Sequence, residues 1–203
     1  MITGPKYKIC KRLGSGVFEK CQTQKFALAE QRAQKTSTKR PKALSDYGRQ
    51  LIEKQRARFT YGITEGQLSR YVKAASEAQG SDTLAKLYSS LEMRLDNVVY
   101  RLGLASTRRL ARQMVSHGHI TVNGKKVTIP SYRPTVNDMI SVREGSKGRA
   151  LFNTLGEKLK DHTTPTWLSF DASTLEGKVK AVPGIEVGGV AFDIGSVLEV
   201  YSR

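Results

Sequence analysis

Three arginines on one predicted helix are the residues of this chain best suited to bind an anion. Arg108 and Arg112 are one helical turn apart and Arg109 lies beside them, so their guanidinium groups can project from one sector. Guanidinium donors match phosphate oxygens, and three such charges repel one another unless an anion lies between them. The spacing predicts contact with a phosphate backbone, although a solvated helix face remains an alternative for any single helix.

Two short helices must position these arginines. The first is predicted from an apolar stripe at i, i+3, i+4 and i+7 that ends before Gly103: Leu95, Val98, Val99 and Leu102. The second begins behind a cap of Ser106 or Thr107 and ends at Gly118. Its apolar face is Leu110, Ala111, Met114 and Val115.

A small hairpin is predicted directly after the second helix. Ile120 and Val122 alternate with polar residues, and Val127 and Ile129 resume the alternation. The Asn123-Gly124 pair between them is typical of a two-residue turn. Lys125 and Lys126 follow the turn and add two further charges.

This order of helix, arginine helix, His117-Gly118-His119, Asn-Gly hairpin and paired lysines resembles the small RNA-binding module named after ribosomal protein four of the small subunit. The resemblance continues in LIEKQRARFTYGITEGQLSRYV, PTWLSFD and the final VLEVYSR, which look like the bacterial ribosomal protein itself, from about Pro41 onward. It therefore covers most of the chain.

The resemblance implies an RNA-facing surface and particular partners. Module positions that line this surface correspond here to Arg94, Asn97, Arg101, Ser106, Arg108, Arg109, Arg112, His117, His119, Asn123, Lys125 and Lys126. Family membership implies binding at a five-way junction of small-subunit ribosomal RNA early in assembly. It also implies contact with ribosomal protein five near messenger RNA, with an effect on translational accuracy.

Net charge also indicates a nucleic-acid partner. The chain carries 34 basic and 18 acidic residues, for a formal charge of +16, and the excess lies in the first two thirds. From the N-terminus to about residue 42 the basic residues predict an arm without a core that becomes ordered on RNA; those we expect to bind are Lys6, Lys8, Lys11 and Arg12. A following helix, capped by Asp46, presents Arg49, Arg56 and Arg58 on its outer face.

The predicted fold class is α+β, in three parts. Residues 1–43 form the basic arm, 44–92 a helical subdomain that includes a capping box at Thr64–Gln67, and 93–203 the RNA-binding module with a small, mainly antiparallel sheet. A helix is expected over 151–159. Strands are expected around Trp167–Phe170, at Val179–Val182, and as a closing strand over Val197–Tyr201.

Catalysis and metal binding are not expected. Arg94-Leu95-Asp96 imitates the catalytic triplet of pseudouridine synthases that carry the same module, but here Asp96 falls in the module's first helix, where we expect it on the surface or as a cap. Cys10 and Cys21 are too few for structural zinc, which some relatives hold with four cysteines, and we expect free thiols.

We therefore expect a cytoplasmic ribosomal protein with no cofactor, membrane segment or small-molecule substrate. No apolar run approaches the roughly 20 residues needed to span a bilayer. One alternative is a free-standing RNA chaperone, although such chaperones resemble the module alone and lack the region from Trp167 to Arg203. The other is an RNA-modifying protein of the pseudouridine synthase type.

Overall fold

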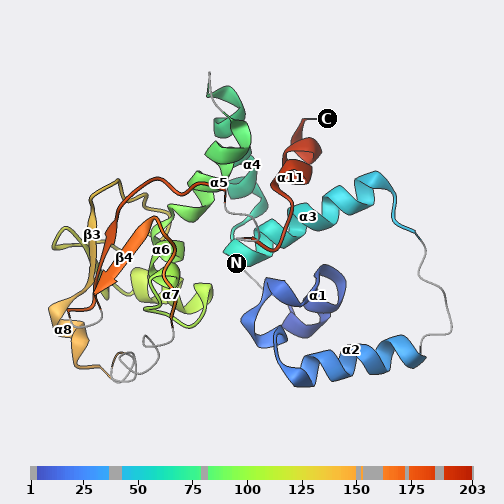
Figure 1. The fold of residues 1–203 in the computed structure, drawn as a ribbon, viewed down its shortest axis with the longest axis horizontal. Helices are drawn as coiled ribbons and strands as arrows, with labels where there is room; N and C mark the ends of the chain where they lie inside the picture. The colour runs from blue at the N-terminus through green and yellow to red at the C-terminus, as the bar shows by residue number, and fades with distance from the viewer. Residues whose placement is uncertain are drawn as a thin grey trace. The chain divides into compact units, whose positions relative to one another are not determined.

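The chain folds into two compact units. The computed structural model describes residues 4–36, 43–78, 82–149, 152, 162–171, 174–185 and 190–202. Unit 1 comprises residues 1–87 and 185–203, and unit 2 comprises residues 88–184 (Figure 1). The division falls inside helix α5 (Thr83–Glu92), and the C-terminal residues return to unit 1 instead of completing the module as predicted.

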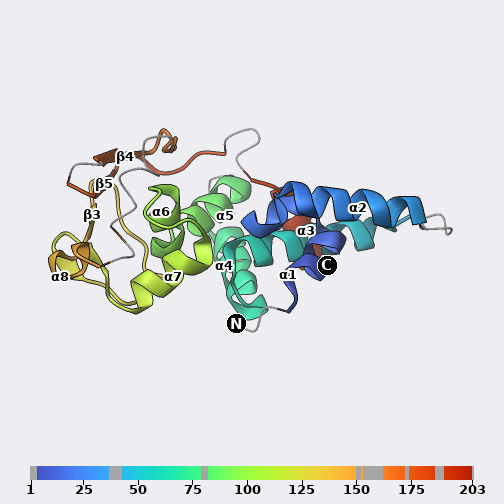
Figure 2. The same ribbon diagram turned by 90° about the horizontal axis from the view of Figure 1, so that it is seen from below.

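Unit 2 is a layer of two helices on one side of a sheet, as both views show (Figures 1 and 2). Helix α6 (Leu95–Arg101) and helix α7 (Arg108–Ser116) confirm the two predicted helices. The five antiparallel strands lie in the order β2-β1-β3-β5-β4. They are β1 (Ile120–Val122), β2 (Lys125–Lys126), β3 (Met139–Val142), β4 (Leu168–Asp171) and β5 (Glu176–Val179), with a short helix α8 (Glu144–Lys147) after β3.

The predicted hairpin joins β1 to β2. Asn123 and Gly124 have φ values of 49° and 76°, the left-handed conformations that a two-residue turn between antiparallel strands requires. Thr121 pairs with Lys126, and Val122 pairs with Lys125. Strand β2 ends there, so the expected continuation through Ile129 is wrong, and Ile129 is exposed.

The apolar stripe of α6 forms the centre of the core of unit 2. Its four residues are fully buried against the apolar faces of α7 and of strands β1 and β3. Leu102 fills the space above Gly177 of β5, where any Cβ would lie 2.6 Å from the leucine side chain. Trp167 and Leu168 add the edge of the sheet to the same core, which confirms the predicted strand there.

The secondary structure of unit 1, within its described residues, is helical. The helices are α1 (Lys6–Leu13), two short 3-10 helices η1 (Ser15–Val17) and η2 (Glu19–Cys21), α2 (Gln24–Thr36), α3 (Asp46–Tyr61), α4 (Glu65–Glu77) and α11 (Ile194–Tyr201), together with the first part of α5. The capping box at the start of α4 is confirmed, because Thr64 and Gln67 bond each other reciprocally. The cap of α3 is Ser45, which accepts from Gly48, and not Asp46 as predicted.

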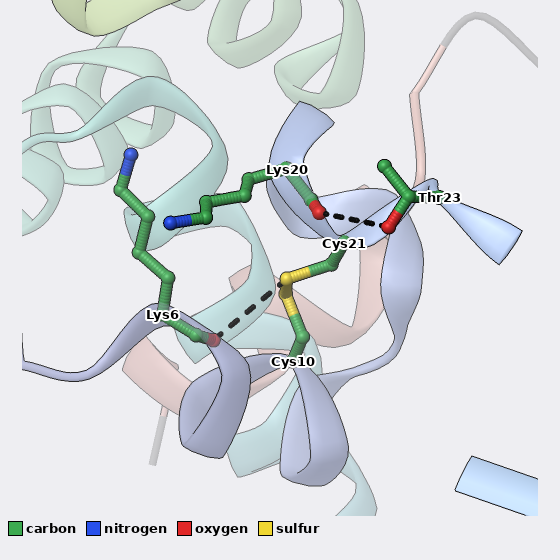
Figure 3. The surroundings of a disulfide bond; sticks show 5 residues. All are labelled: Lys6, Cys10, Lys20, Cys21 and Thr23. Atoms are coloured by element: carbon green, nitrogen blue, oxygen red, sulfur yellow. Dashed lines mark hydrogen bonds between the residues drawn. A yellow bond between two sulfur atoms is a disulfide. The ribbon is translucent and has the colours of Figure 1, made fainter. Parts of the chain in front are cut away.

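The N-terminal segment has a small core, contrary to the prediction. Cys10 and Cys21 are buried together with Phe26, and the two sulfur atoms form a disulfide bond, so the expected free thiols are wrong (Figure 3). Leu13 and Val17 are also buried. Apolar residues spaced along α1 and η1 therefore bury enough surface for local packing, despite the surrounding lysines.

The last stretch of the chain is a helix, not the predicted closing strand. Asp193 caps α11 by accepting hydrogen bonds from the amides of Gly195 and Ser196. The helix packs along α3, and its buried residues are Ile194 and Val197. The helix predicted over 151–159 lies outside the described residues, apart from Phe152, which is helical and buried.

Candidate nucleic-acid interface

Helix α7 presents its three arginines differently, although they share one sector. Thr107 caps the helix by accepting from the amide of Leu110, as one of the two expected caps. Arg109 is exposed, and within the described part of the chain it has no hydrogen bond or ion pair. Arg108 and Arg112 are only partly exposed, because their side chains reach back to α6. The three arginines of the predicted sector therefore differ in exposure, and only Arg109 is fully at the surface.

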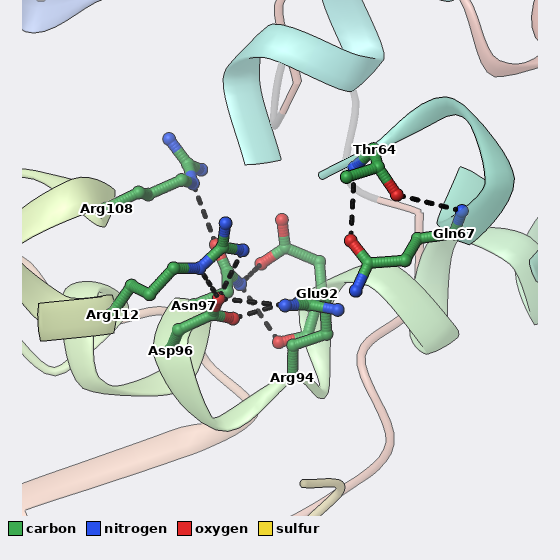
Figure 4. Close-up of polar contacts among 8 residues, drawn as sticks. All are labelled: Thr64, Gln67, Glu92, Arg94, Asp96, Asn97, Arg108 and Arg112. Atoms are coloured by element: carbon green, nitrogen blue, oxygen red, sulfur yellow. Dashed lines mark hydrogen bonds and ion pairs between the residues drawn. The ribbon is translucent and has the colours of Figure 1, made fainter. Parts of the chain in front are cut away.

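Arg112 is held by a buried acid that the sequence analysis placed at the surface. Asp96 lies on α6 and is 3% exposed. Its Oδ2 accepts from Nε of Arg112 at 2.9 Å and from Nη2 at 2.6 Å (Figure 4). On its other side the carboxylate receives a two-point contact from Arg94, at 3.0 and 2.9 Å. Asp96 is neither exposed nor a cap, so that expectation is wrong.

A second buried acid holds the remaining partly exposed arginines. Glu92 is fully buried and accepts from Nε and Nη2 of Arg101, both at 2.9 Å. The amide nitrogen of Asn97 donates to the Glu92 carboxylate and to its backbone carbonyl, each at 2.9 Å. The Asn97 carbonyl then accepts from Nε of Arg108 at 2.8 Å (Figure 4). Sequence reasoning missed Glu92, for which the only signal was an acidic residue nine positions before Arg101.

Two of the predicted contact residues lie inside the protein. Arg94 is 1% exposed and Asn97 is 2% exposed, and both are bonded within the network. An RNA strand at the surface cannot reach side chains that are buried this completely. The structure therefore places both side chains inside the protein, bonded to Asp96 and Glu92, and not on the predicted contact surface. Arg101, Ser106 and Arg108 remain at least partly exposed at or near the ends of α6 and α7.

The hairpin adds exposed charge beside these helices. Lys125 and Lys126 are both exposed, and the Lys126 side chain lies over Gly118, where even a Cβ atom would come within 2.2 Å of it. Asn123 is exposed, but its side chain is engaged within the fold: its oxygen accepts from the Met139 amide at 2.9 Å and its nitrogen donates to Asp138 at 2.8 Å. Asn123 therefore shapes the turn.

The two predicted histidines have different surroundings. His117 is exposed, whereas His119 is 8% exposed, with Nδ1 3.0 Å from the Ser146 hydroxyl and its ring edge-on to Phe152. Burial lowers the pKa of His119 below its ordinary value, and the charges of Arg149, His117 and Arg143 lower it further. His119 is therefore neutral at neutral pH. Arg143 and Arg149, which sequence reasoning passed over, are exposed close to this ring.

The predicted basic residues of unit 1 are mostly at its surface. Lys8, Lys11 and Arg12 of α1 are exposed. Lys6 lies over the Phe18 ring, with its ammonium 5.7 Å from the ring centroid. Arg49 forms an exposed ion pair with Asp46. These side chains can therefore meet an anion without first leaving a buried partner.

Arg56 and Arg58 of α3 are more enclosed. Arg56 donates to the Leu13 carbonyl and to Glu53, both at 2.5 Å. Arg58 lies 3.6 Å from the Glu65 carboxylate and over the Phe59 ring. Burial alone would raise the pKa of Glu65, but hydrogen bonds and charge from its neighbours, above all Lys54, lower it overall. These two arginines therefore help to hold the unit together.

The described residues offer no metal centre. Among them, no group of three or more His, Cys, Asp or Glu side chains could hold a metal ion. The same described residues contain no helix long and apolar enough to cross a membrane.

Comparison with known proteins first defines the class of the module. Residues 93–140, which contain α6, α7, the hairpin and the start of β3, match the S4 domain. Residues 1–92 match the ribosomal protein S4/S9 N-terminal domain. The two matches together cover most of the chain, including all helices of unit 1 except α11.

Full-length relatives then give the family. The chain is 44% identical over 205 residues to the small ribosomal subunit protein uS4 of Acetivibrio thermocellus, covering 99% of this chain and 98% of that protein. It is 45% identical over 202 residues to uS4 of Roseiflexus castenholzii, with 98% of each covered, and 43% identical over 200 residues to uS4A of Alkaliphilus oremlandii, with 97% and 96% covered. The chain belongs to the family of small ribosomal subunit protein uS4. These relatives are named for a place in the ribosome and not for a reaction, in agreement with the expectation of a non-enzyme.

Proposed function

We propose that this protein is a structural component of the small ribosomal subunit and binds its ribosomal RNA directly. The observation that carries the proposal is the set of partly exposed arginines on α6 and α7, which two buried acids hold in place within an S4 domain. The net charge of +16 supports an RNA partner, and the full-length match to uS4 proteins supports the ribosome as its location.

The RNA contacts are proposed to be mainly with phosphates and sugars. A-form RNA has a deep, narrow major groove that side chains cannot read, so a helix junction is recognised by its shape. In unit 2 the proposed contact residues are Arg101, Ser106, Arg108, Arg109, Arg112, His117, Lys125 and Lys126. Lys6, Lys8, Lys11, Arg12 and Arg49 are the proposed contacts of unit 1. His119, Asn123, Arg56 and Arg58 are proposed to support the fold around these contacts.

The finer assignment follows from the family resemblance. We propose the five-way junction in the 5′ part of the ribosomal RNA as the binding site, with binding early in subunit assembly. Ribosomal protein five is the proposed protein neighbour, close to messenger RNA, and its contact with this chain affects accuracy. Support for this assignment is the resemblance from about Pro41 onward and the 44% identity to uS4 over 99% of the chain.

Sedimentation tests the ribosomal assignment. A structural component should co-sediment with small subunits in a sucrose gradient, at one copy per subunit, and should stay bound through a high-salt wash. An RNA chaperone would appear on immature particles and leave in high salt. A modifying enzyme would be present at far less than one copy per subunit. Asp96 argues against the synthase alternative, because it is buried between Arg94 and Arg112.

A further inference from the structure

An RNA-binding surface gains attraction from each positive charge and loses it with each negative one. Glu92 and Asp96 nevertheless lie directly behind the arginines of α6 and α7. Their side chains are 0% and 5% exposed, whereas those of Arg101 and Arg112 are 22% and 29% exposed. The part of each ion pair that reaches the surface is therefore the arginine, and the acid is behind it.

We propose that Glu92 and Asp96 are positioning residues that fix Arg101, Arg108 and Arg112 in the orientation that binds RNA phosphates. The inference rests on the proposed RNA-binding function and adds a role for two residues that carry the wrong charge to touch RNA. It differs from a stabilising role alone, because it assigns part of the RNA affinity to acids that do not contact RNA.

Glu92 acts on two arginines. Both of its oxygens accept from Arg101, and this two-point contact fixes the plane of the guanidinium group. The same carboxylate fixes the Asn97 amide, whose oxygen accepts from Arg108. The Arg108 guanidinium also lies over the Tyr100 ring, 4.4 Å from its centroid. Arg108 is therefore held on two sides.

Asp96 acts on Arg112 through the two contacts of its Oδ2 atom. Arg94 bonds the same carboxylate from the inside, at 3.0 and 2.9 Å, and is itself almost fully buried (Figure 4). The carboxylate is therefore held in place by one arginine and presents its remaining acceptor capacity to another. Because Arg94 is fixed in the core, it fixes the Asp96 carboxylate, and the carboxylate in turn fixes the Arg112 guanidinium at the surface.

The physical reason for such a device is conformational entropy. A free arginine side chain samples many rotamers and loses that freedom when it binds a phosphate, which weakens the complex. An arginine that the fold already orders loses less on binding. The acids also neutralise part of the repulsion among the clustered arginines, so that these can lie close together in the free protein.

The test exploits two opposite expectations. Glu92→Gln and Asp96→Asn each remove one negative charge, so attraction between charges alone predicts tighter binding to RNA. Positioning predicts weaker binding, by about tenfold, with the slope of log affinity against log salt unchanged because every arginine is still present. Glu144→Gln is the matched control, because Glu144 is an exposed acid of the same unit that pairs with Lys147. Its binding should be unchanged or slightly tighter.

The probe is a ribosomal RNA fragment that contains the five-way junction, compared with an unrelated duplex of equal length. Amide spectra and unfolding curves establish that each variant is folded at the temperature of the titration. Equal or tighter binding by the folded Glu92→Gln and Asp96→Asn proteins would reject the positioning role. If the unaltered protein shows no preference for the junction, the proposed function itself fails, whatever the variants do.

A double-mutant cycle separates positioning from general destabilisation. If Asp96 acts through Arg112, then Asp96→Asn should weaken binding about tenfold alone but have almost no further effect when Arg112 is already Ala. The same loss in both backgrounds would overturn the proposal. If Asp96→Asn does not fold, the cycle of Glu92→Gln with Arg101→Ala provides the test. The loss of RNA affinity caused by Glu92→Gln should then be about half as large when Arg101 is already Ala, because Glu92 also acts on Arg108 through Asn97.

Discussion

The two units carry their basic side chains in different ways. In unit 2 Arg101, Arg108 and Arg112 are partly buried and bonded to Glu92, Asp96 or Asn97. In unit 1 most predicted contact residues are at the surface, and the Arg49–Asp46 pair is an example, with side chains 69% and 76% exposed. The sequence shows the same residue types in both places, so composition does not show which basic side chains the fold holds and which it leaves exposed.

Together with the proposed RNA binding, this difference predicts that the two units contribute differently to affinity and to specificity, a proposed division of labour. Exposed lysines and arginines attract any phosphate backbone and adapt to it, which gives affinity that depends strongly on salt. Arginines held by buried acids present a fixed pattern, which favours an RNA of matching shape. Unit 1 should therefore contribute mainly to general affinity, and unit 2 mainly to the preference for a junction.

The largest effect expected is the loss of a buried acid. Glu92→Ala removes the acceptor of Arg101 and of Asn97, and should lower the free energy of unfolding by roughly 3 kcal/mol, at the low end for a broken buried pair because Arg101 can turn toward solvent. Urea unfolding followed by circular dichroism measures it. A loss below about 1 kcal/mol lies in the range of surface ion pairs. It would show that the buried pairs of unit 2 contribute no more stability than the exposed pairs of unit 1.

Replacing Arg108, Arg109 and Arg112 by Ala should weaken RNA binding about a hundredfold, equal to roughly 2.7 kcal/mol. The slope of log affinity against log salt should fall by about 2 to 3, because about three phosphate contacts are lost. Filter-binding titrations at several salt concentrations give both values. An unchanged slope would exclude phosphate contact by these residues. The single variant Arg109→Ala should lower the same slope by about 1.

A smaller effect is expected from pH. The pKa of His119 is lowered by burial, so between its ordinary value, about 6.5, and its folded value the unfolded chain binds more protons than the folded one. The contribution of neutral His119 to the free energy of unfolding is complete above about pH 6.5. It is lost as the pH falls toward the pKa of His119 in the folded protein. Unfolding curves from pH 7.5 to 5 should show this loss, and His119→Gln should lack it. Identical pH profiles for both proteins would contradict the assignment.

The smallest effect is expected at the surface of unit 1. Arg49→Ala breaks an exposed pair with Asp46 and should change the free energy of unfolding by less than about 0.5 kcal/mol. Its effect on RNA binding should be a slope change of at most about 1, with the junction preference unchanged. A lost preference for the junction would show that unit 1 also reads shape, and would remove the proposed division of labour.

Local patterns were sufficient for much of the fold. The spacing of Leu95 and Val98 predicted α6, and the Asn123-Gly124 pair predicted the hairpin, because both depend on interactions between residues close in sequence. The capping box at Thr64 and the basic character of α7 were predicted for the same reason. The resemblance to the ribosomal family also rested on such short motifs in a fixed order.

Contacts between distant residues decided the rest. Burial of Arg94 and Asn97, and the role of Glu92, depend on how α5, α6 and α7 meet, and no single helix pattern contains that information. The run VLEVY has β-branched residues that favour a strand, yet the cap at Asp193 and packing along α3 make it a helix. Cys10 and Cys21 come together for a similar reason, because α1 and η2 fold back on each other. Sequence thus determined the local elements and the charge, and tertiary packing determined which charges the surface presents.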